Sequence, residues 1–202
     1  MGFDGPVAMI AAVRIAVTGD SIAYGRNDPA GGWAARLAEH HLGAGLPGRR
    51  VWNLAIPGAT LLGMRRYSPA ECRVREVDTV LIGAGINDIA GIGGTRETPK
   101  HLTTGMEELC LAHEGDGRRV VVLGPTWFDE QRIGTEMGLR VETATLQCYR
   151  ESLAGLCERT GRVFVDMWEP LAGRTDLLAD GVHPSHEGHQ VLWEHLMRVW
   201  VE

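Results

Sequence analysis

The sequence contains a single lysine, Lys100, and its four cysteines form no CxxC pair. Lysine-dependent chemistry is therefore excluded everywhere else in the chain. The cysteines are widely spaced along the sequence, which argues against a zinc knuckle or a disulfide framework and favours reduced, buried thiols. No apolar stretch is long enough to suggest a membrane span.

An excess of positive charge is also absent. The chain has 20 Lys and Arg against 26 Asp and Glu, a net charge of -6. Binding to phosphate backbones needs a concentrated basic face, so we expect no nucleic-acid partner. Hydrophobic residues at 44% and charged residues at 23% are typical of a globular domain in water.

The N-terminal segment lacks the features of a targeting signal. It has no basic region, and the apolar run Val7–Val13 is too short for a signal peptide. We therefore expect a cytoplasmic protein in which residues 1–12 are a loose lead-in. A chain of 202 residues suits one well-buried core, so residues 13–202 are expected to form a single domain.

Short β-branched runs alternate with segments of helical periodicity. Strands are expected at 13–18, 50–55, 77–83, 119–124 and 162–166. Helices are expected at 32–43, 61–75, 99–114, 136–159 and 186–200. This alternation predicts an α/β fold, a three-layer α/β/α sandwich around a five-stranded parallel sheet. The expected strand order is the flavodoxin-like 2-1-3-4-5, which places the loops after the first and third strands side by side.

The first strand runs into Gly19-Asp20-Ser21, where a glycine permits a sharp turn. A serine at this point presents its hydroxyl at the carboxyl edge of the sheet, the edge at which open α/β sheets bind ligands. The pattern suits a nucleophile. It equally suits an ordinary turn serine that caps a helix.

Asp180 and His183 lie three residues apart in a short loop before the last helix. At this spacing the carboxylate can accept the Nδ1 proton of the imidazole, which leaves Nε2 free to take a proton from Ser21. Taken alone, the same pattern also describes a turn aspartate and a surface histidine.

Other site types fit the sequence less well. His183, His186 and His189 with Glu187 resemble a ligand set, but Pro184 indicates that the helix begins after His183, so we expect no metal. No complete GxGxxG or GK[ST] motif is present, and the only lysine is badly placed for a phosphorelay receiver. We expect no cofactor.

Four short motifs occur in order along the chain: Gly19-Asp20-Ser21, Asn53-Leu54-Ala55-Ile56-Pro57-Gly58, Gly85-Ile86-Asn87-Asp88 and Asp180-Gly181-Val182-His183-Pro184. Together they resemble the four conserved blocks of the SGNH hydrolases, also called the GDSL esterase family, and they span nearly the whole chain. The second block departs modestly, since many members carry a second small residue beside its glycine.

The resemblance implies that Ser21 is the nucleophile, His183 the general base and then acid, and Asp180 the residue that orients His183. It implies an oxyanion hole formed by the backbone amides of Ser21 and Gly58 with the side-chain amide of Asn87. Convergent neutral donors are what a tetrahedral oxyanion requires. Candidate substrate-binding positions near the four loops are Arg26, Met64, Arg65, Tyr67, Ile89, Trp127 and Phe128.

We therefore expect a serine esterase that cleaves an ester or thioester of a small to medium acyl group through an acyl-enzyme. Two alternatives remain open. The same acyl-serine would serve an acyltransferase or a carbohydrate O-acetyl esterase. A binding module without turnover would keep the fold, but it would have little use for an intact Ser21, Asn87, Asp180 and His183.

Overall fold

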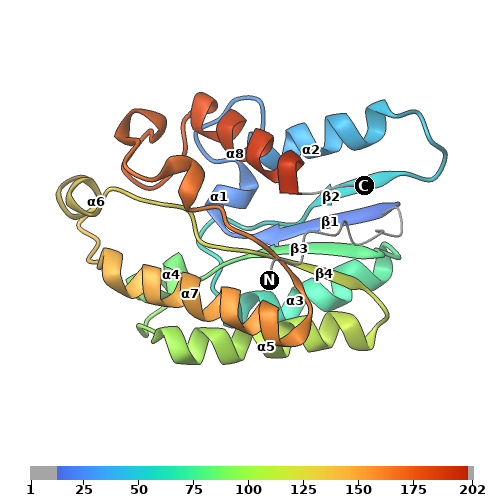
Figure 1. The fold of residues 1–202 in the computed structure, drawn as a ribbon, viewed down its shortest axis with the longest axis horizontal. Helices are drawn as coiled ribbons and strands as arrows, with labels where there is room; N and C mark the ends of the chain where they lie inside the picture. The colour runs from blue at the N-terminus through green and yellow to red at the C-terminus, as the bar shows by residue number, and fades with distance from the viewer. Residues whose placement is uncertain (1–12, 200–202) are drawn as a thin grey trace, which may run out of the picture.

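The structure is a computed structural model that describes residues 13–199. Its centre is a five-stranded, all-parallel sheet in the order β2-β1-β3-β4-β5 (Figure 1). The strands are β1 (Arg14–Gly19), β2 (Arg50–Asn53), β3 (Thr79–Gly83), β4 (Arg119–Leu123) and β5 (Val163–Val165). The predicted fold class and strand order are confirmed. The expected lead-in, residues 1–12, lies outside the described residues.

Helices cover both faces of the sheet (Figure 1). One face packs against α2 (Gly32–Gly43) and α8 (His186–Val199), and the other against α3 (Leu61–Val74), α5 (Pro99–Gly115) and α7 (Thr143–Thr160). Shorter helices are α1 (Ser21–Tyr24), α4 (Ile86–Ala90), α6 (Glu130–Glu136), η1 (Glu169–Leu171) and η2 (Thr175–Leu177). Among the described residues, no helix combines the length and apolar character needed to cross a bilayer.

The alternation of side chains along the central strands explains the two cores. In β1, Ile15 and Val17 point into the cluster with Trp33 and Leu37 of α2, whereas Ala16 points into the opposite cluster. Both sets are fully buried. A strand covered on both faces needs apolar residues at successive positions, which is why these strands are continuous β-branched runs.

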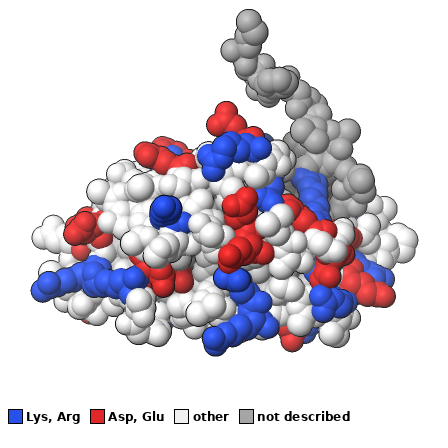
Figure 2. Space-filling model, turned by 90° about the horizontal axis from the view of Figure 1, so that it is seen from below, with Lys and Arg blue, Asp and Glu red and all other residues white. Residues whose placement is uncertain are grey.

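The face seen in Figure 2 carries both signs of charge in close alternation, and neither forms a continuous patch on its described part. Exposed ion pairs join α3 to α5 and to the residue that follows α5. Arg65 pairs with Glu108, and Arg73 pairs with Asp116 at the end of α5 at 2.8 Å. Exposed pairs of this kind contribute little to stability, because water and salt screen the attraction between the charges.

One predicted helix is too long at its beginning. Helical spacing suggested 136–159, but α6 ends at Glu136, and α7 begins only at Thr143. Gly138 adopts a left-handed conformation, φ 65°, which interrupts the helix. The Glu130 carboxylate then accepts the Thr143 amide at 2.8 Å, at the first turn of α7. Residues 137–142 are consequently irregular.

The turn between β3 and α4 depends on a glycine. Gly85 has φ 129°, and a Cβ at this position would lie 2.3 Å from Cε1 of the fully buried Tyr149. Both features exclude a larger residue. The close packing of Gly85 on α7 sets where α4 begins, and α4 carries Asn87.

We predict that Gly85→Ala destabilises the protein by about 2–4 kcal/mol, because a methyl group meets both backbone strain and a buried ring. The melting temperature should fall by roughly 5–15 °C. Gly43→Ala is the matched control, since Gly43 has an ordinary helical backbone and open space around it. Equal melting temperatures for the two variants would contradict this account of Gly85.

Candidate active site

The turn after β1 presents Ser21 at the carboxyl edge of the sheet. Ser21 is the first residue of α1, and the Asp20 carboxylate caps this helix by accepting the Ile22 amide at 2.9 Å. The serine is therefore held by backbone geometry on one side and by a side-chain cap on the other. Ser21 is buried, with only 5% of its surface exposed.

His183 connects Ser21 to Asp180. Its Nε2 lies 2.8 Å from the Ser21 hydroxyl, and its Nδ1 lies 2.7 Å from Oδ2 of Asp180. The second carboxylate oxygen accepts the His183 backbone amide at 2.8 Å. An ionised carboxylate can only accept, so Nδ1 carries the ring proton, and Nε2 is the basic nitrogen that faces the serine.

The loop that carries these two residues is closed by its own backbone. The Ala179 amide donates to the His183 carbonyl at 2.8 Å. From α6, Arg132 donates to the Leu178 and Ala179 carbonyls at 3.2 and 3.1 Å. These bonds hold the carboxylate and the imidazole in fixed relative positions.

Electrostatics keep the imidazole neutral and the carboxylate ionised. Burial lowers the pKa of His183 below its ordinary value, and this outweighs the opposing effect of Asp180; Arg26 lowers the pKa further. For Asp180, burial works to raise the pKa, but the hydrogen bonds from the His183 backbone and ring bring it below its ordinary value. At neutral pH the pair is thus ready to accept a proton from Ser21.

Asn87 lies on α4, directly after β3, the strand that pairs with β1. Its side-chain amide donates one hydrogen to the Ala59 carbonyl at 2.9 Å and retains a second for a ligand. The neighbouring Asp88 accepts the Leu61 amide with both carboxylate oxygens, at 3.0 and 3.2 Å. The loop of residues 54–60 is thereby tied to α4.

Ser21, Gly58, Asn87 and His183 line one hollow of about 80 Å³. The predicted residues from the four sequence motifs are therefore brought together. The remaining wall is mainly apolar and comes from α4 and the residues after it, from α6 and the irregular residues 137–142, and from the loop before α8. It consists of Ile86, Ala90, Ile92, Ile133, Met137, Leu139, Val141 and Val182, with Arg26 at the same hollow.

Most of the predicted substrate-binding positions lie elsewhere. Arg26 lines the hollow, but Met64, Ile89 and Phe128 are buried in the core, at 0–5% exposure.

The other three predicted positions also lie outside the hollow's lining. The Tyr67 hydroxyl donates to the Leu54 carbonyl at 3.3 Å, and Arg65 pairs with Glu108. Trp127 packs against both core clusters. The sequence analysis did not predict the wall formed by Ile133, Met137, Leu139 and Val141. Three of these residues, Met137, Leu139 and Val141, lie within the expected helix 136–159, so they were not considered as site residues.

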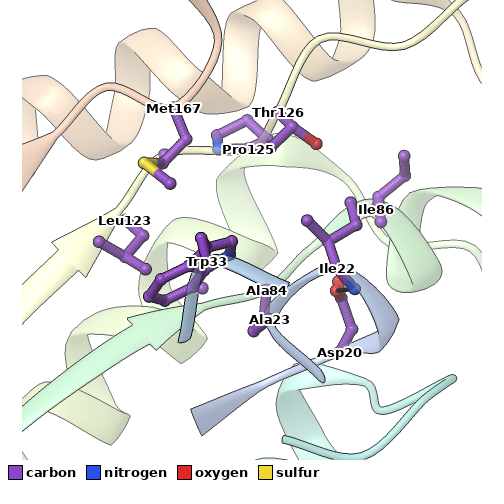
Figure 3. Close-up of a pocket in the computed structure, with 12 residues that line it drawn as sticks. Asp20, Ile22, Ala23, Trp33, Ala84, Ile86, Leu123, Pro125, Thr126 and Met167 are labelled. Carbon is purple, nitrogen blue, oxygen red and sulfur yellow. Dashed lines mark hydrogen bonds between the residues drawn. The ribbon is translucent and has the colours of Figure 1, made fainter. Parts of the chain in front are cut away.

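A smaller cavity of about 40 Å³ lies beneath the nucleophile turn (Figure 3). Trp33, Leu123 and Met167 line one side of it, and Asp20 and Ile22 line the other (Figure 3). Burial raises the pKa of Asp20 to about 6. Ser21 does not line this cavity, which is therefore distinct from the hollow that Ser21 and His183 share.

The three histidines that resembled a metal-ligand set have separate partners. His183 bonds to Ser21 and Asp180, His186 Nδ1 lies 2.9 Å from Asp28, and His189 Nδ1 lies 3.4 Å from the Trp33 amide. Helix α8 begins at His186, after His183. Within residues 13–199, no group of three or more His, Cys, Asp or Glu side chains is arranged to hold a metal ion.

Sequence comparison agrees with this geometry. Residues 17–191 match the GDSL-like Lipase/Acylhydrolase family. The chain belongs to this family. It is a GDSL-type carboxylic ester hydrolase, which the SGNH motifs predicted. No curated protein sequence matches the chain.

Several solved structures share the fold of this chain. A lipase/acylhydrolase from Enterococcus faecalis is 21% identical with a TM-score of 0.76, and the match covers 92% of this chain and 94% of that one. An acetyl-xylooligosaccharide esterase from Geobacillus is 21% identical with a TM-score of 0.75, over 96% and 98% of the two chains. A GDSL-family lipolytic protein from Veillonella parvula is 19% identical with a TM-score of 0.72, over 94% and 98%.

We predict that a fluorophosphonate probe labels Ser21 alone, at a rate that rises with pH as His183 loses its proton. The midpoint should lie below 6.5, because burial lowers the pKa of His183 from that value. His183→Ala should slow labelling by about 10²- to 10⁴-fold, the usual contribution of a general base. The measurement is intact-mass and peptide analysis over time.

The matched control is His101→Ala, which removes an exposed histidine on α5. Its labelling rate should equal that of the unaltered protein. Labelling of another residue, or equally fast labelling of Ser21 without His183, would contradict the assignment.

Proposed function

We propose that the GDSL hydrolase cleaves esters or thioesters of short to medium acyl groups through an acyl-enzyme on Ser21. The observation that carries this proposal is the Ser21–His183–Asp180 hydrogen-bonded series, which opens onto a hollow with apolar walls. Nucleophile, base and acyl-binding surface are thus adjacent.

The reaction begins when His183 Nε2 takes the Ser21 proton as Oγ bonds to the substrate carbonyl carbon. The carbonyl oxygen becomes an oxyanion, for which the Ser21 and Gly58 backbone amides and the Asn87 side-chain amide are the proposed donors. His183 then gives its proton to the leaving alcohol or thiol as the bond from the carbonyl carbon breaks. Water attacks the acyl-serine by the same route and releases the acid.

Asp180 is proposed to remain ionised throughout. Its hydrogen bond to Nδ1 fixes the tautomer and stabilises the imidazolium that forms when Nε2 takes the proton. The low pKa of Asp180 supports this role, because a carboxylate that stays charged cannot take the proton away from the ring.

The apolar wall supports an acyl group as the part of the substrate that enters the hollow. Ile92, Met137 and Leu139 offer hydrocarbon contacts, and burial of each methylene contributes about 0.8 kcal/mol. The volume of about 80 Å³ is small, which favours short chains over long ones.

A carbohydrate O-acetyl esterase is the second candidate. It is favoured by the structural likeness to the acetyl-xylooligosaccharide esterase, since an acetyl group needs only the part of the hollow next to Ser21. Turnover on acetylated xylo-oligosaccharides against p-nitrophenyl acetate distinguishes the two. Product analysis with an added alcohol distinguishes hydrolysis from acyl transfer.

We predict that Asn87→Ala lowers kcat on p-nitrophenyl acetate by about 10²- to 10³-fold, because one oxyanion donor is lost. Gln147→Ala removes a comparable amide from the exposed surface of α7 and should leave kcat unchanged. Steady-state kinetics measure both variants, and circular dichroism checks that each is folded. A folded Asn87→Ala variant with unaltered kcat would remove Asn87 from the oxyanion hole.

We also predict that kcat/KM on p-nitrophenyl esters is highest for short acyl chains and falls toward decanoyl. Met137→Trp should fill part of the hollow and lower kcat/KM for hexanoyl relative to acetyl by about tenfold, equivalent to about two methylenes excluded from the wall. Leu111→Trp, on the exposed side of α5, is the control. A preference for decanoyl, or an unaltered hexanoyl-to-acetyl ratio in Met137→Trp, would refute the proposed acyl site.

A further inference from the structure

Asp180 has a second side-chain partner besides His183. The side-chain amide of Asn27 donates to Oδ2 of Asp180 at 3.0 Å, the same oxygen that accepts from His183 Nδ1. The other oxygen, Oδ1, accepts the backbone amides of Val182 and His183 at 3.3 and 2.8 Å. Asn27 therefore completes the set of donors around the carboxylate, and it does so from a segment 153 residues away.

The backbone holds Asn27 in an uncommon conformation. Its φ of 68° is left-handed, which among the described non-glycine residues is shared only by Glu76. Asparagine tolerates this region better than most residues, because its short polar side chain can satisfy the local backbone. The left-handed turn at residue 27 thus belongs to the segment that bonds to the Asp180 loop.

The next residue anchors the same segment to α8. The Asp28 carboxylate is fully buried and accepts from the Ala30 amide at 2.9 Å and from Arg36 at 2.6 Å. It also bonds to His186 Nδ1 at 2.9 Å. Residues 27 and 28 therefore contact the chain on both sides of His183, at Asp180 and at His186.

We propose that Asn27 is a positioning residue of the hydrolase. Its side-chain amide orients the Asp180 carboxylate and makes this carboxylate a weaker acceptor for the Nδ1 proton of His183. The proposal rests on the proposed function of Ser21 and His183. A neutral donor on Oδ2 fixes the carboxylate plane toward Nδ1. It also stabilises the negative charge of Asp180 and makes the carboxylate less basic.

Removal of the Asn27 amide is expected to raise the pKa of His183. Without Asn27, the Asp180 oxygen carries more unshared charge and stabilises the imidazolium more strongly, so the pKa of His183 rises. The other groups that act on this pair are Arg26 in the same loop, Arg132 on α6 and His189 on α8. Replacement of the uncharged Asn27 leaves all three in place.

The test compares Asn27→Gly, Asn27→Ala and Asn27→Asp by the pH dependence of kcat/KM on p-nitrophenyl acetate. Glycine removes the amide and relieves the left-handed conformation, whereas alanine removes the amide and keeps the strain. Both should lower kcat by about three- to tenfold and move the acidic limb upward by about 0.5 pH unit. Asn27→Asp keeps the size of the side chain but replaces the donor with a second carboxylate. It should move the acidic limb of the pH profile to a higher pH than the other two variants do.

Glu76→Gly is the matched control, because it removes a polar side chain, one that pairs with Arg14, from the other left-handed non-glycine position. Its pH profile should match that of the unaltered protein. A melting curve for each variant shows whether it is folded.

A second readout is independent of turnover. NMR titration of the His183 ring should show its pKa raised in Asn27→Gly and Asn27→Ala and unaltered in Glu76→Gly. If the unaltered protein cleaves no ester, the proposed function fails, and the titration still decides the role of Asn27. If the Asn27 variants are folded and keep both the His183 pKa and the acidic limb of the unaltered protein, the positioning role is refuted.

Discussion

The hydrogen bond between the Ser21 hydroxyl and His183 Nε2 joins the end of the first strand to the loop before the last helix, across 162 residues. Its 2.8 Å length depends on the packing of the whole sandwich. Ser21 is placed by β1, which lies between β2 and β3 in the sheet, whereas His183 is placed by a loop that contacts α6 and continues into α8. Helix α8 packs against α2, which follows the nucleophile turn, so both partners of the bond are attached to the same layer.

Buried ionisable groups near the site respond to pH in opposite directions. Burial raises the pKa of Asp20 and of Asp88 to about 6, so their contribution to stability is present below an unfolded pKa of 3.8 and is lost as the pH rises through 6. Burial lowers the pKa of His183 and brings that of His189 to about 4, so these groups oppose folding as the pH falls below 6.5. Both effects have the same cause, because burial disfavours the charged form of a carboxyl group and of an imidazole alike.

The parts of the site that sequence could locate are those determined by local chemistry. A β-branched strand followed by Gly19-Asp20-Ser21, and an aspartate three residues before a histidine, are readable because each motif works through neighbours in the chain. Parallel pairing of β1 with β3 then brings the Ser21 and Asn87 loops together, as the strand order predicted.

The apolar wall of the hollow could not be predicted in this way. Met137, Leu139 and Val141 fall within the expected helix 136–159, whereas in the structure the left-handed Gly138 interrupts the helix and all three residues line the hollow. The hydrogen bond from Asn27 to Asp180 could not be predicted from the sequence either. It joins two loops that the tertiary fold brings together, and neither loop carries a sequence pattern that indicates this contact.

Different interactions hold the polar and the apolar parts of the hollow in place. The polar part includes His183 and Asn87, whose side chains are hydrogen-bonded to Asp180 and to the Ala59 carbonyl, so a small displacement would break these bonds. The apolar half comes largely from α6 and the irregular residues 137–142, where contacts are non-directional and side-chain size can vary at low cost. Substitutions in that segment can therefore alter the shape of the hollow while the Ser21–His183–Asp180 geometry stays intact.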